Sequence, residues 1–115
     1  MAASAVYRTL GGTAPTTNGT VTLYTCGTAV TGGAVISTIA IANTTGSAGS
    51  YRIFVQDEGA AAATGNAIAF DVAIAANDTV ALTLGITLDA ADVISVRTTN
   101  ANQLNFFAFG SEITN

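Results

Sequence analysis

Apolar residues recur at every second position through most of this sequence, and turn residues interrupt the alternation at short intervals. A period of two places successive side chains on opposite faces of a β-strand, whereas a helix needs apolar residues three and four positions apart. Many short alternating segments separated by turns are typical of antiparallel sandwiches and barrels. The pattern therefore predicts an all-β chain, and no segment has the pattern of a stable helix.

Eight segments carry this alternation. The predicted strands span residues 5–10, 20–25, 34–43, 51–57, 67–74, 79–85, 93–98 and 104–109. Segment 34–43 is apolar on both faces, which favours a central position in a sheet. Segments 67–74 and 79–85 are predicted to pair as a hairpin, and so are the two strands that flank the loop at 44–50.

The clearest alternation lies in segment 67–74. Its large apolar side chains, which are predicted to share one face, are Ile68, Phe70, Val72 and Ile74. The four alanines at 60–63 have high helix propensity, but so short a run does not form a stable helix. We therefore expect a surface loop over residues 58–66.

A chain of 115 residues has the length of one domain and can bury a core of its own. Eight strands with short connections predict a single antiparallel β-sandwich. The jelly roll is one connectivity that the pattern leaves open. Residues 20–115 are predicted to form the sandwich, and residues 1–19 an N-terminal arm or an edge strand.

Charged side chains are scarce. They make up 9% of the chain, against about a quarter in an average soluble domain. The cations are Arg8, Arg52 and Arg97, and the net charge is −4. Nucleic acids and anionic membranes attract clustered Lys and Arg, so we expect neither as a partner. No apolar run has the length of a membrane helix, and residues 1–10 lack the pattern of a secretory signal, so we expect synthesis in a cytoplasm.

The residue types needed for most catalytic schemes are missing. Nucleophilic catalysis by Ser or Cys needs a base, and the chain has neither histidine nor lysine. Cys26 is the single cysteine, so it has no disulfide partner and no Cys/His cluster for zinc; we expect a free thiol in a small apolar niche. No enzymatic activity, cofactor or small-molecule substrate is expected.

Most carboxylates fall at predicted turns, where Asp and Asn usually cap backbone N–H groups. The alternative is a calcium site, which Asp57, Glu58 and the turn at 77–78 could form if their loops converge. Asp71 differs because it lies within a strand. We predict that it forms an exposed ion pair with Arg52 across the sheet.

The surface has the features of a protein that associates. Soluble monomers protect sheet edges with Lys, charges or Pro, but this chain has no lysine and a single proline, Pro15. Phe54 is predicted to point outward, and Phe107 and Phe109 lie opposite the core-facing side of the last strand. These three residues form the candidate interface, and the edges are expected to be covered by another chain or by terminal arms. The alternative is a monomer whose Ala, Thr and Gly surface prevents association.

From residue 20 to the C-terminus, the ordered series of segments resembles small virion structural proteins of tailed bacteriophages, particularly those that infect cyanobacteria and other aquatic bacteria. The segments that carry the resemblance are 35–39, 42–43, 51–53, 67–71, 74–79, 82–88, 92–96 and 109–113. Two segments depart from the family. Residues 26–28 stand where related sequences often have a proline-containing turn, and residues 56–65 differ from the usual loop.

The resemblance implies a non-enzymatic β-sandwich component of the virion. We favour a capsid cement (decoration) protein, on the capsid surface, that stabilises the lattice of the major capsid protein. Such a protein would sit as a trimer or at symmetry points of the shell. It would bind adjacent major capsid subunits, copies of itself, or both, through apolar surface and strand edges. The alternatives are a module of the tail or its fibres, and a host-adhesion module that binds carbohydrate. Sugar sites favour exposed aromatic residues, particularly Trp, and this chain has no Trp.

Overall fold

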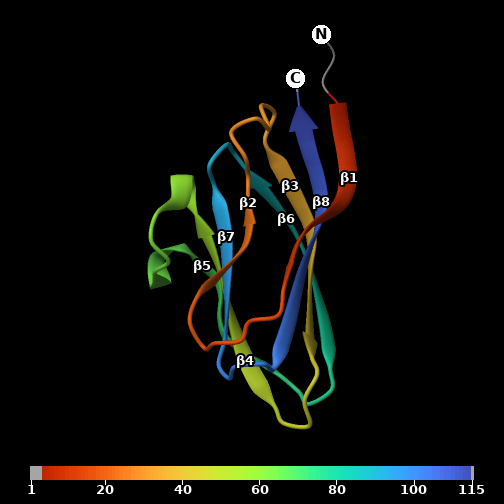
Figure 1. The fold of residues 1–115 in the computed structure, drawn as a ribbon, viewed down its shortest axis with the longest axis vertical. Coiled ribbons are helices and arrows are strands. Elements are labelled where there is room, and N and C mark those ends of the chain that lie inside the picture. Colours follow the sequence, from red (N-terminus) through yellow and green to blue (C-terminus); the bar gives the residue numbers. More distant parts are fainter. Residues whose placement is uncertain (1–3, 115) are drawn as a thin grey trace.

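The alternating segments form β-strands in the computed structural model, which describes residues 4–114 (Figure 1). The strands are β1 (Ser4–Thr13), β2 (Val21–Thr25), β3 (Ala34–Asn43), β4 (Gly49–Gln56), β5 (Ala67–Ile74), β6 (Thr79–Leu88), β7 (Val93–Thr98) and β8 (Leu104–Thr114). Two 3-10 turns lie at the two ends of the predicted loop at 58–66: η1 (Asp57–Gly59), which begins one residue before it, and η2 (Thr64–Asn66). The alanines between them are not helical.

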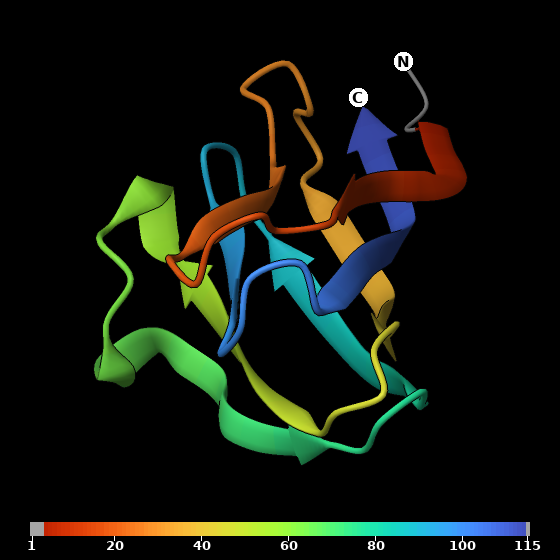
Figure 2. The same cartoon turned by 60° about the horizontal axis from the view of Figure 1, so that its bottom comes forward.

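The strands of residues 4–114 form two packed four-stranded sheets, which Figures 1 and 2 show as separate layers. The first sheet has the order β1-β8-β3-β6 and the second has the order β2-β7-β4-β5. All neighbouring strands are antiparallel. The prediction of a single antiparallel β-sandwich is confirmed, and β3 is central as its two apolar faces indicated.

The strand pairs are nested along the chain: β4 with β5, β3 with β6, β2 with β7 and β1 with β8. Both predicted hairpins are therefore wrong, because β3 and β4 belong to different sheets, and so do β5 and β6. Their connecting loops cross between the layers and meet each other, since the Asn77 N–H donates to the Thr45 carbonyl at 3.0 Å. A short turn can join two layers as well as two neighbouring strands, and alternation does not distinguish the two cases.

The core lies between the two layers. Ile39, Ile41 and Phe106 of the first sheet and Tyr51 and Ile53 of the second are almost completely buried. The rings of Tyr51 and Phe106 meet edge to face, with centroids 6.5 Å apart at an interplanar angle of 76°. Burial of each large apolar side chain contributes about 1.5–3 kcal/mol, so this layer of side chains holds the two sheets together.

Strand β5 departs from simple alternation. Its pairing with β4 has two register shifts. Asp71 lies in the first of them, between Val72 and Ala69, and has a positive φ of 53°. Each bulge turns the residues beyond it relative to the sheet. Ile68 and Phe70 are exposed while Ile74 is buried, so the predicted common face of these side chains is wrong.

Candidate interaction surface

Strand β8 presents two phenylalanines on the outer face of the first sheet. Phe106 and Ala108 point into the core, so the residues that alternate with them point outward. Phe107 is 42% exposed and Phe109 is 38% exposed. Their rings stack with centroids 6.4 Å apart and an interplanar angle of 21°. The two-faced character predicted for the last strand is confirmed.

Small, uncharged residues extend this outer face across the sheet. In β3, Thr38 is the register partner of Phe109 and Ala40 is the partner of Phe107. In β6, Thr83 is the register partner of Thr38 and Ala81 is the partner of Ala40. We call this set, together with the two phenylalanines, the Phe107/Phe109 face. Because its other members are short, the two rings stand above an uncharged surface.

A glycine makes room for one of the rings. Gly12 of β1 is the register partner of Phe107, and a Cβ atom at this position would lie 2.8 Å from the Phe107 ring. That distance is shorter than any ordinary carbon–carbon contact. The edge strand therefore leaves the Phe107 ring the space that it occupies beside β8.

The prediction that Phe54 lies at the surface is wrong. The outward direction of the Phe54 side chain was predicted correctly. Phe54 is the register partner of Ser95 on the outer side of the second sheet, and it is not part of the sandwich core. However, Phe54 is only 4% exposed. η2 contacts β4 here, and the Gln56 amide donates to the Ala60 carbonyl at 2.6 Å, so the loop folds back over this end of the sheet. Of the three candidate interface residues, only Phe107 and Phe109 are exposed.

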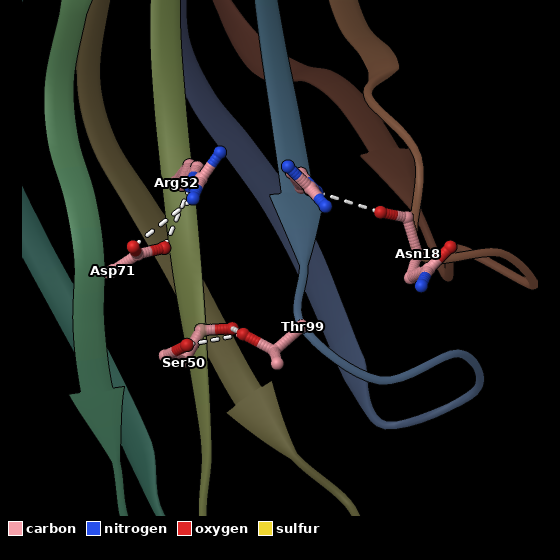
Figure 3. Close-up of polar contacts among 6 residues, drawn as sticks. Asn18, Ser50, Arg52, Asp71 and Thr99 are labelled. Atoms are coloured by element: carbon pink, nitrogen blue, oxygen red, sulfur yellow. Dashed lines mark hydrogen bonds and ion pairs between the residues drawn. The ribbon is translucent and has the colours of Figure 1, made fainter. Parts of the chain in front are cut away.

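The predicted ion pair between Arg52 and Asp71 is confirmed (Figure 3). The Arg52 guanidinium donates from Nε at 2.7 Å and from Nη2 at 3.1 Å to the two carboxylate oxygens of Asp71. This bidentate hydrogen bonding lowers the pKa of Asp71. The Arg52 guanidinium also lies 3.9 Å from the ring centroid of Phe70. Asp71 and Phe70 together fix the orientation of the guanidinium.

A second charged cluster was missed by the sequence analysis. Glu112 of β8 accepts hydrogen bonds from the Tyr24 hydroxyl of β2 and from Arg8 of β1. Burial, and then the hydrogen bond to Glu112, raises the pKa of Tyr24. The cluster ties the N-terminal strand to both sheets. No local pattern could have revealed it, because the three side chains come from opposite ends of the chain.

Turn carboxylates cap backbone groups, as predicted. Asp92 accepts from the N–H groups of Glu58 and Asp89 at 2.9 Å each, and these hydrogen bonds lower its pKa. The Asn77–Asp78 turn is at the opposite end of the sandwich from η1 (Figure 1), so the loops of the alternative calcium site do not converge. Within residues 4–114, no three His, Cys, Asp or Glu side chains are grouped to hold a metal ion.

Cys26 is a free thiol with no exposed surface, as the sequence analysis expected. Burial raises the pKa of this thiol, which disfavours the reactive thiolate. We expect native protein to react with a thiol-specific chromogenic disulfide at least about a thousandfold more slowly than protein in concentrated urea, because modification requires opening of the fold. Stopped-flow absorbance measures both rates. Equal rates would show that the niche opens freely.

The described part of the chain contains no helix that is long and apolar enough to cross a membrane. The Phe107/Phe109 face is an uncharged sheet face that carries two stacked, exposed phenylalanine rings. Comparison with protein-family models, with curated proteins and with solved structures finds no match to this chain.

Proposed function

We propose that this chain is a non-enzymatic virion structural protein, a capsid cement protein that binds the major capsid lattice through the Phe107/Phe109 face. The exposed, stacked phenylalanine pair on an uncharged face is the observation that carries the proposal. The free energy falls when a partner covers large apolar groups on such a face, because their surface is removed from water. A capsid lattice offers the same partner surface many times, and the resemblance of the sequence to phage virion proteins points to that partner.

The strand order supports the same proposal. Four nested antiparallel pairs, distributed over two sheets, have the arrangement of one long hairpin folded over itself. We infer that the sandwich is a jelly roll of two Greek keys, an architecture that recurs in viral capsid proteins. Because one fold serves many functions, the surface carries more weight here than the topology.

The sheet edges supply a second mode of contact. Val6 and Tyr7 of β1 are exposed at the outer edge of the first sheet, where no further strand pairs with β1 among the described residues. Edge strands bind neighbouring chains through main-chain hydrogen bonds. In the proposed role, the Phe107/Phe109 face contacts the capsid protein, and the exposed β1 edge joins copies of this chain into a trimer on the capsid surface.

Charge introduced into the Phe107/Phe109 face tests the role. We expect Phe107→Asp and Phe109→Asp each to weaken saturable binding to expanded, empty phage capsids by at least about tenfold, because a carboxylate buried without a partner disfavours the complex. Sedimentation of capsids with bound protein measures this. Thr22→Asp is the matched control, since it places the same charge on an exposed position of β2 in the other sheet.

Circular dichroism separates lost binding from lost folding in these variants. Variants that keep the wild-type spectrum and still bind capsids with wild-type affinity would overturn the proposed face. Quantitative mass spectrometry of purified virions tests the location independently. A copy number that matches the repeated positions of the shell supports the cement role, whereas a small number per virion supports a tail protein.

A further inference from the structure

The outer face of the second sheet contains a polar hollow of about 350 Å³. Its lining residues are Ser50 and Arg52 of β4, Asp71 of β5, Arg97 of β7 and Thr99, which directly follows β7. Ligand pockets commonly have volumes of about 300–1,000 Å³, so the hollow can hold a small molecule. It faces away from the Phe107/Phe109 face, because the two sheets turn opposite sides to the solvent.

Two cations oppose each other in this hollow. Arg52 of β4 is the direct register partner of Arg97 of β7. Like charges at opposing positions destabilise a strand pair, and only one carboxylate, Asp71, lines the hollow with them. The chain as a whole has a net charge of −4 and only three arginines. The hollow therefore concentrates two of the three cations and has a local charge of about +1, by the ordinary charges of its side chains.

Most N–H donors of the two guanidinium groups have no acceptor within the described chain. Arg97 donates from Nε to the Asn18 carbonyl at 2.7 Å, and Arg52 donates from two nitrogens to Asp71. A guanidinium has five N–H groups in a fixed fork that matches a carboxylate. Among residues 4–114, no carboxylate forms a salt bridge with Arg97. The hollow is thus equipped to bind an anion beside Arg97.

The remaining lining groups favour a ligand that also carries hydroxyls. The Ser50 and Thr99 hydroxyls bond to each other at one end of the hollow, and the Thr99 hydroxyl also donates to the Ser50 carbonyl at 3.1 Å (Figure 3). Hydroxyl groups both donate and accept, and the Asp71 carboxylate accepts. A sugar ring presents hydroxyl groups to all three. Arg52, which stacks on Phe70, holds the Asp71 carboxylate in place through two hydrogen bonds. Less conformational entropy is therefore lost when Asp71 accepts a hydrogen bond from the ligand.

We propose that this hollow binds an acidic sugar, a uronate whose carboxylate bonds to Arg97 and whose hydroxyls bond to Asp71, Ser50 and Thr99. A singly charged carboxylate balances the local charge, whereas a doubly charged phosphate would meet the Asp71 carboxylate with an excess of charge. A neutral sugar would leave Arg97 uncompensated. The site is independent of the capsid role, because it occupies the opposite side of the sandwich and would face outward in a lattice-bound protein.

Titration of the ¹⁵N-labelled chain with sodium glucuronate, followed by NMR, tests the proposal. We expect saturable shifts of the Arg97 and Thr99 amide signals, with glucose and sodium acetate each binding at least about tenfold more weakly than glucuronate. Arg97→Gln should weaken glucuronate binding at least about tenfold, because it removes the charged fork. Arg8→Gln is the matched control, since it removes the arginine outside the hollow and should leave binding unchanged.

A second variant addresses the sugar hydroxyls and guards against misfolding of Arg97→Gln. Thr99→Ala alters an exposed position just beyond β7 and should weaken glucuronate binding while acetate binding stays as in the wild type. Glucuronate binding no tighter than that of acetate or sulfate would overturn the proposal, and so would a folded Arg97→Gln variant that binds glucuronate normally. Capsid binding by Arg97→Gln should equal that of the wild type, so the two proposals fail separately.

Discussion

Phe106→Ala is expected to lower the free energy of unfolding by about 3–5 kcal/mol. The Phe106 side chain has no exposed surface, and its ring meets Tyr51 of the opposite sheet edge to face. Truncation would leave a cavity at the centre of the contact between the two layers. Since small domains are stable by about 5–15 kcal/mol, this loss is a large fraction of the total.

Urea denaturation followed by far-UV circular dichroism measures the change. Phe107→Ala is the matched control, because it makes the same truncation one position along the same strand on the outer face. We expect that variant to lose about 1 kcal/mol, mainly from the stacking with Phe109. Similar losses in the two variants would contradict the assignment of Phe106 to the core and Phe107 to the surface.

Gly110→Ala is expected to lower the free energy of unfolding by about 3 kcal/mol, through overpacking at a site that cannot relax. A Cβ atom at Gly110 would lie 1.9 Å from the Val35 carbonyl oxygen and 3.0 Å from the Ile36 Cα atom. Both are backbone atoms of the neighbouring β3, so no side-chain rotation removes the clash. Strands β8 and β3 would have to separate in the middle of the first sheet.

The matched control for this substitution is Gly46→Ala. A Cβ at Gly46 meets nothing within 4 Å, so we expect a change within about 0.5 kcal/mol. Thermal unfolding of both variants under the same conditions provides the comparison. A Gly110→Ala protein as stable as the wild type would show that β3 and β8 approach less closely than the structure indicates.

The close approach at Gly110 accompanies an irregularity in the sheet. Between Ile36, the partner of Gly110, and Thr38, the partner of Phe109, the register shifts by one residue at Ser37. The Ser37 hydroxyl donates to the Phe109 carbonyl at 3.0 Å and satisfies an acceptor at this bulge. Bulges bend a strand locally and redirect the side chains beside it. The orientation of Phe109 on the proposed interface therefore depends on Ser37 and Gly110.

The strands and the faces of most of them could be predicted from the sequence. The predicted ranges 34–43, 67–74 and 93–98 coincide with β3, β5 and β7, because alternation is a local property of the chain. The exposed positions of Phe107 and Phe109 follow from the same property. The ion pair between Arg52 and Asp71 was also predictable, since each had few partners of opposite charge to choose from.

Only the tertiary structure determined which strands pair and what covers each face. Chain neighbours such as β5 and β6 lie in different layers, a loop buries Phe54, and bulges turn Ile68 and Phe70 outward. The hollow around Arg97 likewise joins residues from three strands. The period of two by itself determined an all-β chain with an apolar last strand. Pairing, bulges and loop cover depended on long-range contacts, which local periodicity does not encode.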